Sequence, residues 1–396
     1  MTPTTAVQQR LLTPGPTAVP QPVLEEMAQP IIHHRTKQFE GIFAEVGQRL
    51  ARLMKTSGPV LSISGSGTTA FEAAQVSLAR PGSTVVAISG GKFGERWQDV
   101  FDQYEGALTI KPVKIDVPWG EAVSPDTVEQ VLREHEDVSL VAVVHSETST
   151  ATACDIKAVA SAVRSAAPAA LLLVDGITSV GAMPVEQDAW GIDALVTGSQ
   201  KALMLPPGLG YVGLGERALV RLQEVKAGPY YNLDLRRWLK AHANNTVPFT
   251  PPVSLIRGQL VALKMIEEEG LENVQKRTAT LARATHAAFK TLGLQLCSHR
   301  PSDSVSGAFY PDDADDKAFR SALRDEYGIH IAGGQDGRGA SWSGRIFRLS
   351  HMGYVTSEDT LAALNAIETL LLKMAPNTVA CKAGEAVAAA EAELRK

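Results

Sequence analysis

The chain has 396 residues, of which 44% are hydrophobic and 20% are charged, and its formal net charge at pH 7 is -5. This length exceeds what one hydrophobic core usually serves, so we expect a globular protein with two lobes. The negative net charge and the lack of a basic stripe argue against nucleic acid as the main partner.

Cysteine usage and hydropathy indicate the cell compartment and whether disulfides, metal sites or membrane spans are expected. The three cysteines, Cys154, Cys297 and Cys381, are far apart and predict neither a disulfide framework nor a zinc site, so no metal is expected. The N-terminus carries no basic segment followed by an apolar core, and no run of about 18 apolar residues predicts a membrane span. We therefore expect a cytoplasmic protein.

Short apolar runs alternate with helical patterns over most of the first 250 residues. After an N-terminal segment (1–19), this texture predicts a large domain over 20–255, in which helical patterns such as 68–79 and 156–166 separate the runs. Such alternation is typical of an α/β fold, with a mostly parallel sheet covered by helices on both faces and ligands bound at the carboxyl ends of its strands. Six runs are expected as strands: 60–64, 84–89, 139–145, 170–176, 194–199 and 210–214.

A glycine turn follows the first of these strands. In "SISGSGTTAFEAA" (62–74), the backbone N–H groups at the start of the next helix and the hydroxyls of Ser66 and Thr68 form a ready phosphate site around Gly67. The same stretch also fits a dinucleotide fingerprint, but that interpretation requires an acidic residue at the end of the next strand, which ends instead in Ser89 and glycines. A purely structural turn is the third possibility.

One aspartate and one lysine stand at the ends of later runs. Asp175 is either a turn former before Gly176 or a carboxylate at the sheet edge. Lys201 is either the opening of a surface turn before the proline and glycine of 206–210 or a desolvated amine with a lowered pKa. If both converge with the glycine loop, they match what pyridoxal phosphate requires: a phosphate site, an amine that forms an imine with the aldehyde, and an acid that keeps the ring nitrogen protonated.

The pattern of apolar and polar residues changes after residue 250. Long amphipathic helical patterns, a few short strands and a helical pattern near 357–374 predict a smaller α+β domain over 256–376. The alanine-rich end, 377–396, is expected as a C-terminal helical extension without chemistry of its own.

Taken together, the motifs resemble those of the class V aminotransferases of the alanine:glyoxylate and serine:pyruvate group, a branch of the fold type I pyridoxal-phosphate enzymes. The similarity extends from residue 13 to about residue 370. The motifs that carry it, in chain order, are "TPGPT" (13–17), "SGSG" (64–67), "VDG" (174–176), "GSQKAL" (198–203), "PPGLG" (206–210), "EEGLENV" (268–274) and "RIFRLSHMG" (345–353).

This resemblance implies a homodimer and a set of cofactor contacts. Lys201 would hold the cofactor as an imine and move the proton, and Asp175 would face the ring nitrogen. Thr246 would reach the phosphate from the partner subunit, although a tyrosine found in some members three residues earlier is here Ala243. The other implied cofactor residues are Ser66, Gly67, Thr68 and Gln200 at the phosphate, Thr148 at the ring oxygen, Ile177 beneath the ring and Phe93 stacked on it.

The resemblance also implies a substrate site. Arg348 occupies the position that grips the substrate carboxylate, a task that suits a guanidinium. Strand alternation places Arg348 and Arg345 on opposite faces without deciding which one faces solvent. Gly15 in "TPGPT", and His34 with Arg35 in "IIHHRT", fall in segments that can line the entrance.

The implied activity is transfer of an amino group from alanine or serine to glyoxylate or pyruvate. One alternative is a lyase or desulfurase of the same fold, which would need a mobile nucleophilic cysteine. The other is a non-catalytic, hydrogenase-associated subunit that keeps the fold as a scaffold, against which the intact Lys201, Asp175 and Arg348 argue.

Overall fold

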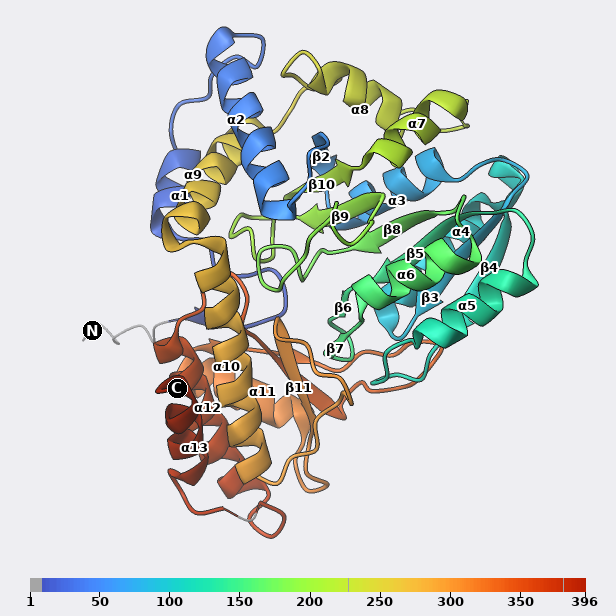
Figure 1. The fold of residues 1–396 in the computed structure, drawn as a ribbon. Helices are drawn as coiled ribbons and strands as arrows, with labels where there is room; N and C mark the ends of the chain where they lie inside the picture. Colours follow the sequence, from blue (N-terminus) through green and yellow to red (C-terminus); the bar gives the residue numbers. More distant parts are fainter. Residues whose placement is uncertain (1–8, 227, 380) are drawn as a thin grey trace.

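The computed structural model describes residues 9–226, 228–379 and 381–396, which form a large lobe and a small lobe joined by long helices (Figure 1). The large lobe is built on a seven-stranded sheet with the strand order β2-β10-β9-β8-β5-β3-β4. Only β10 runs antiparallel to its neighbours. The strands are β2 (Val60–Gly65), β3 (Thr84–Ser89), β4 (Lys111–Asp116), β5 (Val138–Val144), β8 (Leu171–Asp175), β9 (Ala194–Gly198) and β10 (Gly208–Leu214).

Side-chain alternation along the strands explains why both faces of this sheet are covered. Val85 and Leu140 point to the face where Phe71 and Trp97 of the helices α3 (Gly67–Leu78) and α4 (Lys92–Leu108) pack. The next residue along each strand points to the opposite face, which is covered by α2 (Lys37–Met54), α5 (Pro125–Glu134) and α6 (Ile156–Ala166). The expected α/β architecture is confirmed.

The remaining large-lobe elements surround this core. Two short strands, β6 (Ser146–Glu147) and β7 (Thr152–Ala153), pair after β5. Helix α9 (Val253–Glu269) lies against α1 (Gln21–Met27) and α2 in the structure. It leads through Gly270 into α10 (Leu271–Thr291), which runs down to the small lobe (Figure 1). The other helices are α7 (Glu216–Glu224) and α8 (Leu235–His242).

The small lobe packs a three-stranded sheet, in the order β11-β14-β13, against helices. Its strands are β11 (Val305–Phe309), β13 (Ala332–Gly333) and β14 (Ile346–Ser350), and its helices are α10 (Leu271–Thr291), α11 (Asp316–Tyr327), α12 (Ser357–Met374) and α13 (Glu385–Leu394). The C-terminal helix α13 docks on α10 and α12, and Ala386 and Ala390 are fully buried there. None of the helices in the described residues is long and apolar enough to cross a membrane.

The N-terminal segment ties the lobes together. Strand β1 (Arg10–Leu11) pairs with β12 (Ile329–His330) of the small lobe. The chain then crosses to the large lobe, where Thr17 donates its N–H to the Gln200 carbonyl (3.1 Å) and its hydroxyl to the Lys201 carbonyl (2.7 Å). The "TPGPT" motif therefore lies directly over the end of β9.

Candidate functional site

A cavity of about 90 Å³ opens at the carboxyl edge of the seven-stranded sheet. Strands β2, β5, β8 and β9 run in the same direction, so the residues that follow them meet here. Most of the residues expected from the sequence to bind the cofactor line this cavity. Its lining is Gly67, Thr68, Phe93, Arg96, Val144, Ser146, Thr148, Asp175, Ile177, Thr178, Gln200 and Lys201.

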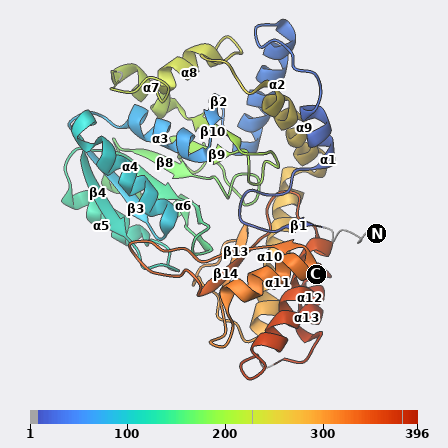
Figure 2. The same ribbon diagram turned by 180° about the vertical axis from the view of Figure 1, so that it is seen from behind.

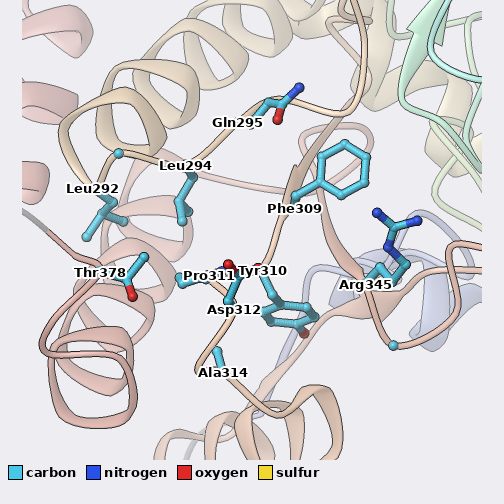
Figure 3. Close-up of a pocket in the computed structure, with 12 residues that line it drawn as sticks. Leu292, Leu294, Gln295, Phe309, Tyr310, Pro311, Asp312, Ala314, Arg345 and Thr378 are labelled. Atoms are coloured by element: carbon cyan, nitrogen blue, oxygen red, sulfur yellow. The ribbon is translucent and has the colours of Figure 1, made fainter.

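A larger cavity, of about 430 Å³, lies on the small lobe and has a different character (Figure 3). Its lining contains no residue expected at the site, and its charged members are Asp312 and Arg345. The Arg345 guanidinium stands 5.7 Å from the centre of the Phe309 ring, and the residue is exposed. We therefore place the candidate site at the sheet edge.

Lys201 is a desolvated amine and not the opening of a surface turn. The pKa of Lys201 is lowered from 10.5 to about 8, mainly by burial and also by the charges of Arg348 and Arg96, while Asp175 offsets part of the effect. The Nζ atom donates to the Pro14 carbonyl (2.5 Å). A Cβ at Gly15 would stand 2.0 Å from this Nζ, so the predicted residue Gly15 contacts Lys201 closely.

Asp175, the last residue of β8, is fixed by two donors. Its Oδ1 accepts the Ile177 N–H (2.8 Å) and its Oδ2 accepts the Trp97 Nε1–H (2.9 Å). Burial raises its pKa from 3.8 to about 7, and the charge of Glu147 adds to the rise, while the two hydrogen bonds and Lys201 oppose it. Within the described residues this carboxylate forms no ion pair, so a cationic N–H would be a favourable partner.

The start of α3 forms a cradle beside this pair. Ser66 is its N-cap: the hydroxyl accepts the Thr69 N–H (3.4 Å), and Thr69 Oγ1 accepts the Ser66 N–H (3.2 Å). Gly67 lies so close to Ile177 that a Cβ would stand 2.6 Å from its Cδ1. The buried Oε1 of Gln200 has no hydrogen-bond partner among the described residues.

These features fit pyridoxal phosphate. The free backbone N–H groups at the start of α3 suit a phosphate, because a helix N-terminus attracts anions. Gln200 also lines the cavity, where its amide NH2 is the group that can donate to a phosphate, and the Ser66 hydroxyl keeps its proton for donation. The buried Asp175 suits a protonated ring nitrogen, and the Lys201 amine suits an aldehyde.

Arg348 is buried, so its strand face is turned inward. Its Nε and Nη2 donate to the Gly333 carbonyl (3.0 and 2.7 Å), and its Nη1 donates to the Thr148 carbonyl (2.6 Å). Burial lowers its pKa from 12.5 to about 10. One N–H on each terminal nitrogen stays free of these bonds, which is the pair that a carboxylate can accept.

Five predicted site residues are absent from the lining of this cavity. Gly15, Ser66 and Arg348 lie next to residues that line it, whereas Thr246 and His34 do not reach the cavity within one chain. Thr246 follows α8 and is absent from the cavity lining. His34 precedes α2, where its ring lies 4.9 Å from that of His33, and it too is absent from the lining, as is Arg35.

Sequence reasoning missed residues on and beside α4. Arg96 lines the cavity, donates through Nη1 to Thr68 Oγ1 (3.1 Å) and stands 4.8 Å over the Phe93 ring. The fully buried Glu147 accepts the N–H groups of Phe93 and Gly94 (3.0 Å each). A usable signal existed for Arg96, since helical spacing of three residues places it on the same face as Phe93.

The cysteines lack the reactivity that a desulfurase requires. Burial raises the pKa of Cys154 and of Cys297 from 9.0 to about 12, and it raises the pKa of Cys381 as well. All three thiols are therefore protonated near neutral pH, and none of them lines the cavity that contains Lys201.

Comparison with known proteins gives a consistent picture. The model of the family "Aminotransferase class-V" matches residues 10–361. The "Soluble hydrogenase 42 kDa subunit" of Anabaena cylindrica is 38% identical over 96% of this chain and 97% of its own. The "L-aspartate--glyoxylate aminotransferase" of Paracoccus denitrificans is 34% identical over 98% and 97%. The structure of pyridoxamine-pyruvate aminotransferase from Mesorhizobium loti aligns with a TM-score of 0.90 at 28% identity, over 99% of this chain and 98% of that one.

Proposed function

The chain belongs to the class V aminotransferase family, and we propose that it transfers the amino group of a small amino acid, alanine or serine, to glyoxylate or pyruvate. The family makes it an aminotransferase that uses pyridoxal phosphate. The observation that carries the site assignment is the pairing of Lys201 and Asp175, two buried groups with opposite pKa shifts at one sheet edge.

Each residue of this chain has a distinct task in the proposal. Bound pyridoxal phosphate supplies an aldehyde for covalent attachment and an electron-withdrawing ring. Asp175 holds the proton on the ring nitrogen, and Trp97 and Ile177 hold Asp175 in place through their N–H groups. Lys201 is the attachment residue and, when free, the base that moves a proton from the substrate α-carbon, because its lowered pKa leaves much of it neutral near pH 8.

Arg348 fixes the substrate carboxylate in the same proposal. The carbonyls of Gly333 and Thr148 hold its guanidinium, so little side-chain entropy is lost when a carboxylate binds the two remaining N–H groups. Thr148 also lines the cofactor cavity. The substrate carboxylate is thereby placed next to the cavity that holds Lys201.

We assign Arg96 to the cofactor phosphate. Its guanidinium forms no ion pair within the described residues, and it bonds to Thr68, at the start of α3, where an anion is already favoured. A cation that is left without a carboxylate partner beside a helix N-terminus is complementary to a phosphate dianion.

Arg96 also supports a second candidate. A guanidinium in the cavity can instead donate to the distal carboxylate of a dicarboxylic amino acid, and the Paracoccus relative carries an aspartate–glyoxylate name. Both candidates share a short keto acid as acceptor. They differ in whether the donor carries a second carboxylate.

A substrate panel tests the proposal. The purified protein, loaded with pyridoxal phosphate, is assayed with alanine, serine, aspartate and glutamate against glyoxylate and pyruvate. We expect the largest kcat/KM for alanine or serine. A clear preference for aspartate would favour the second candidate, and no turnover with any of these pairs would contradict both.

We further propose a cytoplasmic homodimer in which Thr246 completes the phosphate site of the neighbouring subunit. In support, Thr246 lies outside the cavity of its own chain, although its motif resembles a cofactor-binding segment of the family. The three free cysteines are consistent with a reducing compartment.

A further inference from the structure

A loop of the small lobe reaches across to the large lobe near the candidate site. The segment 334–345, between β13 and β14, leaves the small sheet and extends toward α4 and its neighbours; Figure 2 shows it as the orange loop on the side away from the N-terminus. One side chain of α4 forms hydrogen bonds with the backbone of this loop. The Arg338 and Gly339 N–H groups each donate to the Glu95 carboxylate, both at 2.9 Å.

Glu95 is buried, with only 3% of its surface exposed. Besides the two loop N–H groups, it accepts the Trp119 Nε1–H (3.3 Å), and its nearest cation is Lys92 at 3.9 Å. A buried carboxylate is unfavourable unless donors satisfy it, so the loop and Glu95 stabilise each other.

The fit between loop and helix is close. A Cβ at Gly337 would stand 2.4 Å from Trp119 and 2.5 Å from Glu95, and one at Gly339 would stand 2.7 Å from Trp119. The Arg338 side chain adds a bond to Gln98 Oε1 (2.7 Å) and an exposed ion pair with Asp99. Only glycine leaves room for the backbone to approach the carboxylate at these positions.

The helix and the loop that meet in this contact are each next to a different part of the site, the cofactor cavity and Arg348. On the helix side, Phe93 and Arg96 in the same turn of α4 line the cofactor cavity. On the loop side, the loop begins directly after Gly333, whose carbonyl accepts two bonds from Arg348. Glu95 therefore connects the wall of the cofactor cavity with the support of the arginine.

We propose that Glu95 is a positioning residue that latches the 334–345 loop to α4 and thereby holds Arg348 in register with the cofactor cavity. The inference rests on the proposed role of Arg348. Glu95 touches neither substrate nor cofactor in this proposal. Its loss should weaken capture of the substrate carboxylate and leave cofactor binding unchanged.

The test compares Glu95→Gln with Asp99→Asn in the loaded enzyme. The amide keeps the size of the side chain but turns an NH2 group toward one of the two loop N–H groups, so we expect the KM for the amino donor to rise about tenfold with a much smaller change in kcat. The affinity for pyridoxal phosphate, measured by fluorescence titration, should stay at the wild-type value. Asp99→Asn removes only the exposed ion pair and should behave like wild type.

Both substitutions are repeated in an Arg348→Ala background. If Glu95 acts through Arg348, the effect of Glu95→Gln on KM disappears there. An equal loss in both backgrounds, a wild-type KM for Glu95→Gln, or a loss of cofactor affinity as its main effect would each overturn the latch. If Arg348→Ala alone leaves the donor KM unchanged, the assignment of Arg348 itself fails, so the two failures are distinguishable.

A second variant covers the case in which Glu95→Gln does not fold, as judged by its circular dichroism and thermal melt. Arg338→Ala removes the loop's bonds to Gln98, Asp99 and the Glu95 carbonyl while leaving the buried carboxylate intact. We expect the same KM shift with a smaller factor. An unchanged KM in a folded Arg338→Ala protein would then contradict the latch.

Discussion

The two lobes contribute to the site in different ways. In the large lobe, Ser66, Asp175 and Lys201 each stand at the end of a strand or within three residues of it, so the sheet itself sets their positions. In the small lobe, Arg348 lies in the middle of β14, and the carbonyls of Gly333 and Thr148 set its side-chain position.

This difference separates the chemistry from the selection of substrate. A parallel sheet is rigid and buried, so groups at its edge keep their mutual geometry, as catalysis requires. Arg348 depends on how the small lobe meets the large one. Changes at the sheet edge should therefore abolish the reaction, whereas changes around Arg348 should alter mainly substrate binding.

The largest effect is expected at the sheet edge. In the proposed function, Lys201→Ala removes both the attachment point and the proton-transfer base, and loss of such a base alone is expected to cost about 10²- to 10⁴-fold in rate. Borohydride reduction followed by peptide mapping should fix the cofactor at residue 201 in wild type and nowhere in the variant. Lys92→Ala, a half-exposed neighbour of the cavity wall, is the control and should keep the label. A label on another lysine in wild type would disprove the assignment.

Protonation of Lys201 gives the next effect. Only the neutral amine attacks an aldehyde, and burial sets the pKa of Lys201 at about 8. The rate at which the cofactor-free protein captures pyridoxal phosphate should rise about tenfold per pH unit below pH 8 and level off above it. The measurement is stopped-flow absorbance, divided by the rate for N-acetyl-lysine to remove the titration of the cofactor. Because this reference amine titrates at about pH 10.4, the ratio should be flat below about pH 8 and fall by about tenfold per pH unit from there to about pH 10. A ratio that stays flat up to about pH 10 would mean that the Lys201 amine is solvated.

Arg348→Ala tests the other side of the comparison. Loss of the guanidinium should remove about 1.5–3 kcal/mol of transition-state stabilisation, which lowers kcat/KM by about tenfold to a hundredfold for every donor. The cofactor should stay attached to Lys201. Arg345→Ala is the matched control, because Arg345 lies three residues earlier, is exposed and lines the small-lobe cavity. Equal losses in both variants would show that the carboxylate is bound elsewhere.

The same contrast explains what the sequence could predict. Strands β3 and β8 and helix α12 coincide with the expected segments almost residue for residue, because buried strands and amphipathic helices leave clear apolar patterns. Strand β4 was missed. It is one of the two edge strands of the sheet, and its sequence "KPVKID" is half-exposed and charged, so it carries no apolar run.

The site residues also differ in whether a local sequence pattern could reveal them. Asp175 and Lys201 could be found because a polar residue at the end of an apolar run is a local signal. Glu95 and Arg96 bind residues far away in the chain, at 338–339 and at Thr68, and no local pattern encodes such contacts. Ala151 adopts a positive φ of 56°, a conformation that costs an alanine some strain and that its local sequence does not predict.

Arg96 lies on the cofactor side of the comparison, so its removal should act on the cofactor alone. Arg96→Met should weaken the binding of pyridoxal phosphate by about tenfold or somewhat more, which is the contribution expected of one charge-assisted hydrogen bond. Binding of pyridoxal, which lacks the phosphate, should not change and is the internal control. A variant that binds both forms normally but has a raised KM for aspartate would instead assign Arg96 to a dicarboxylic donor.

Thr246 should give the smallest effect, because one neutral hydroxyl supplies a single bond to a site that several other donors share. We expect Thr246→Ala to retain pyridoxal phosphate about tenfold less tightly, which corresponds to about 1.5 kcal/mol, and Thr246→Ser to match wild type. Mixed dimers decide which subunit benefits. In a dimer of one Lys201→Ala chain and one Thr246→Ala chain, the only site with a lysine faces the intact Thr246 of the other chain. That site should hold the cofactor as tightly as wild type if Thr246 acts across the interface, and as weakly as the Thr246→Ala homodimer if it acts within its own chain.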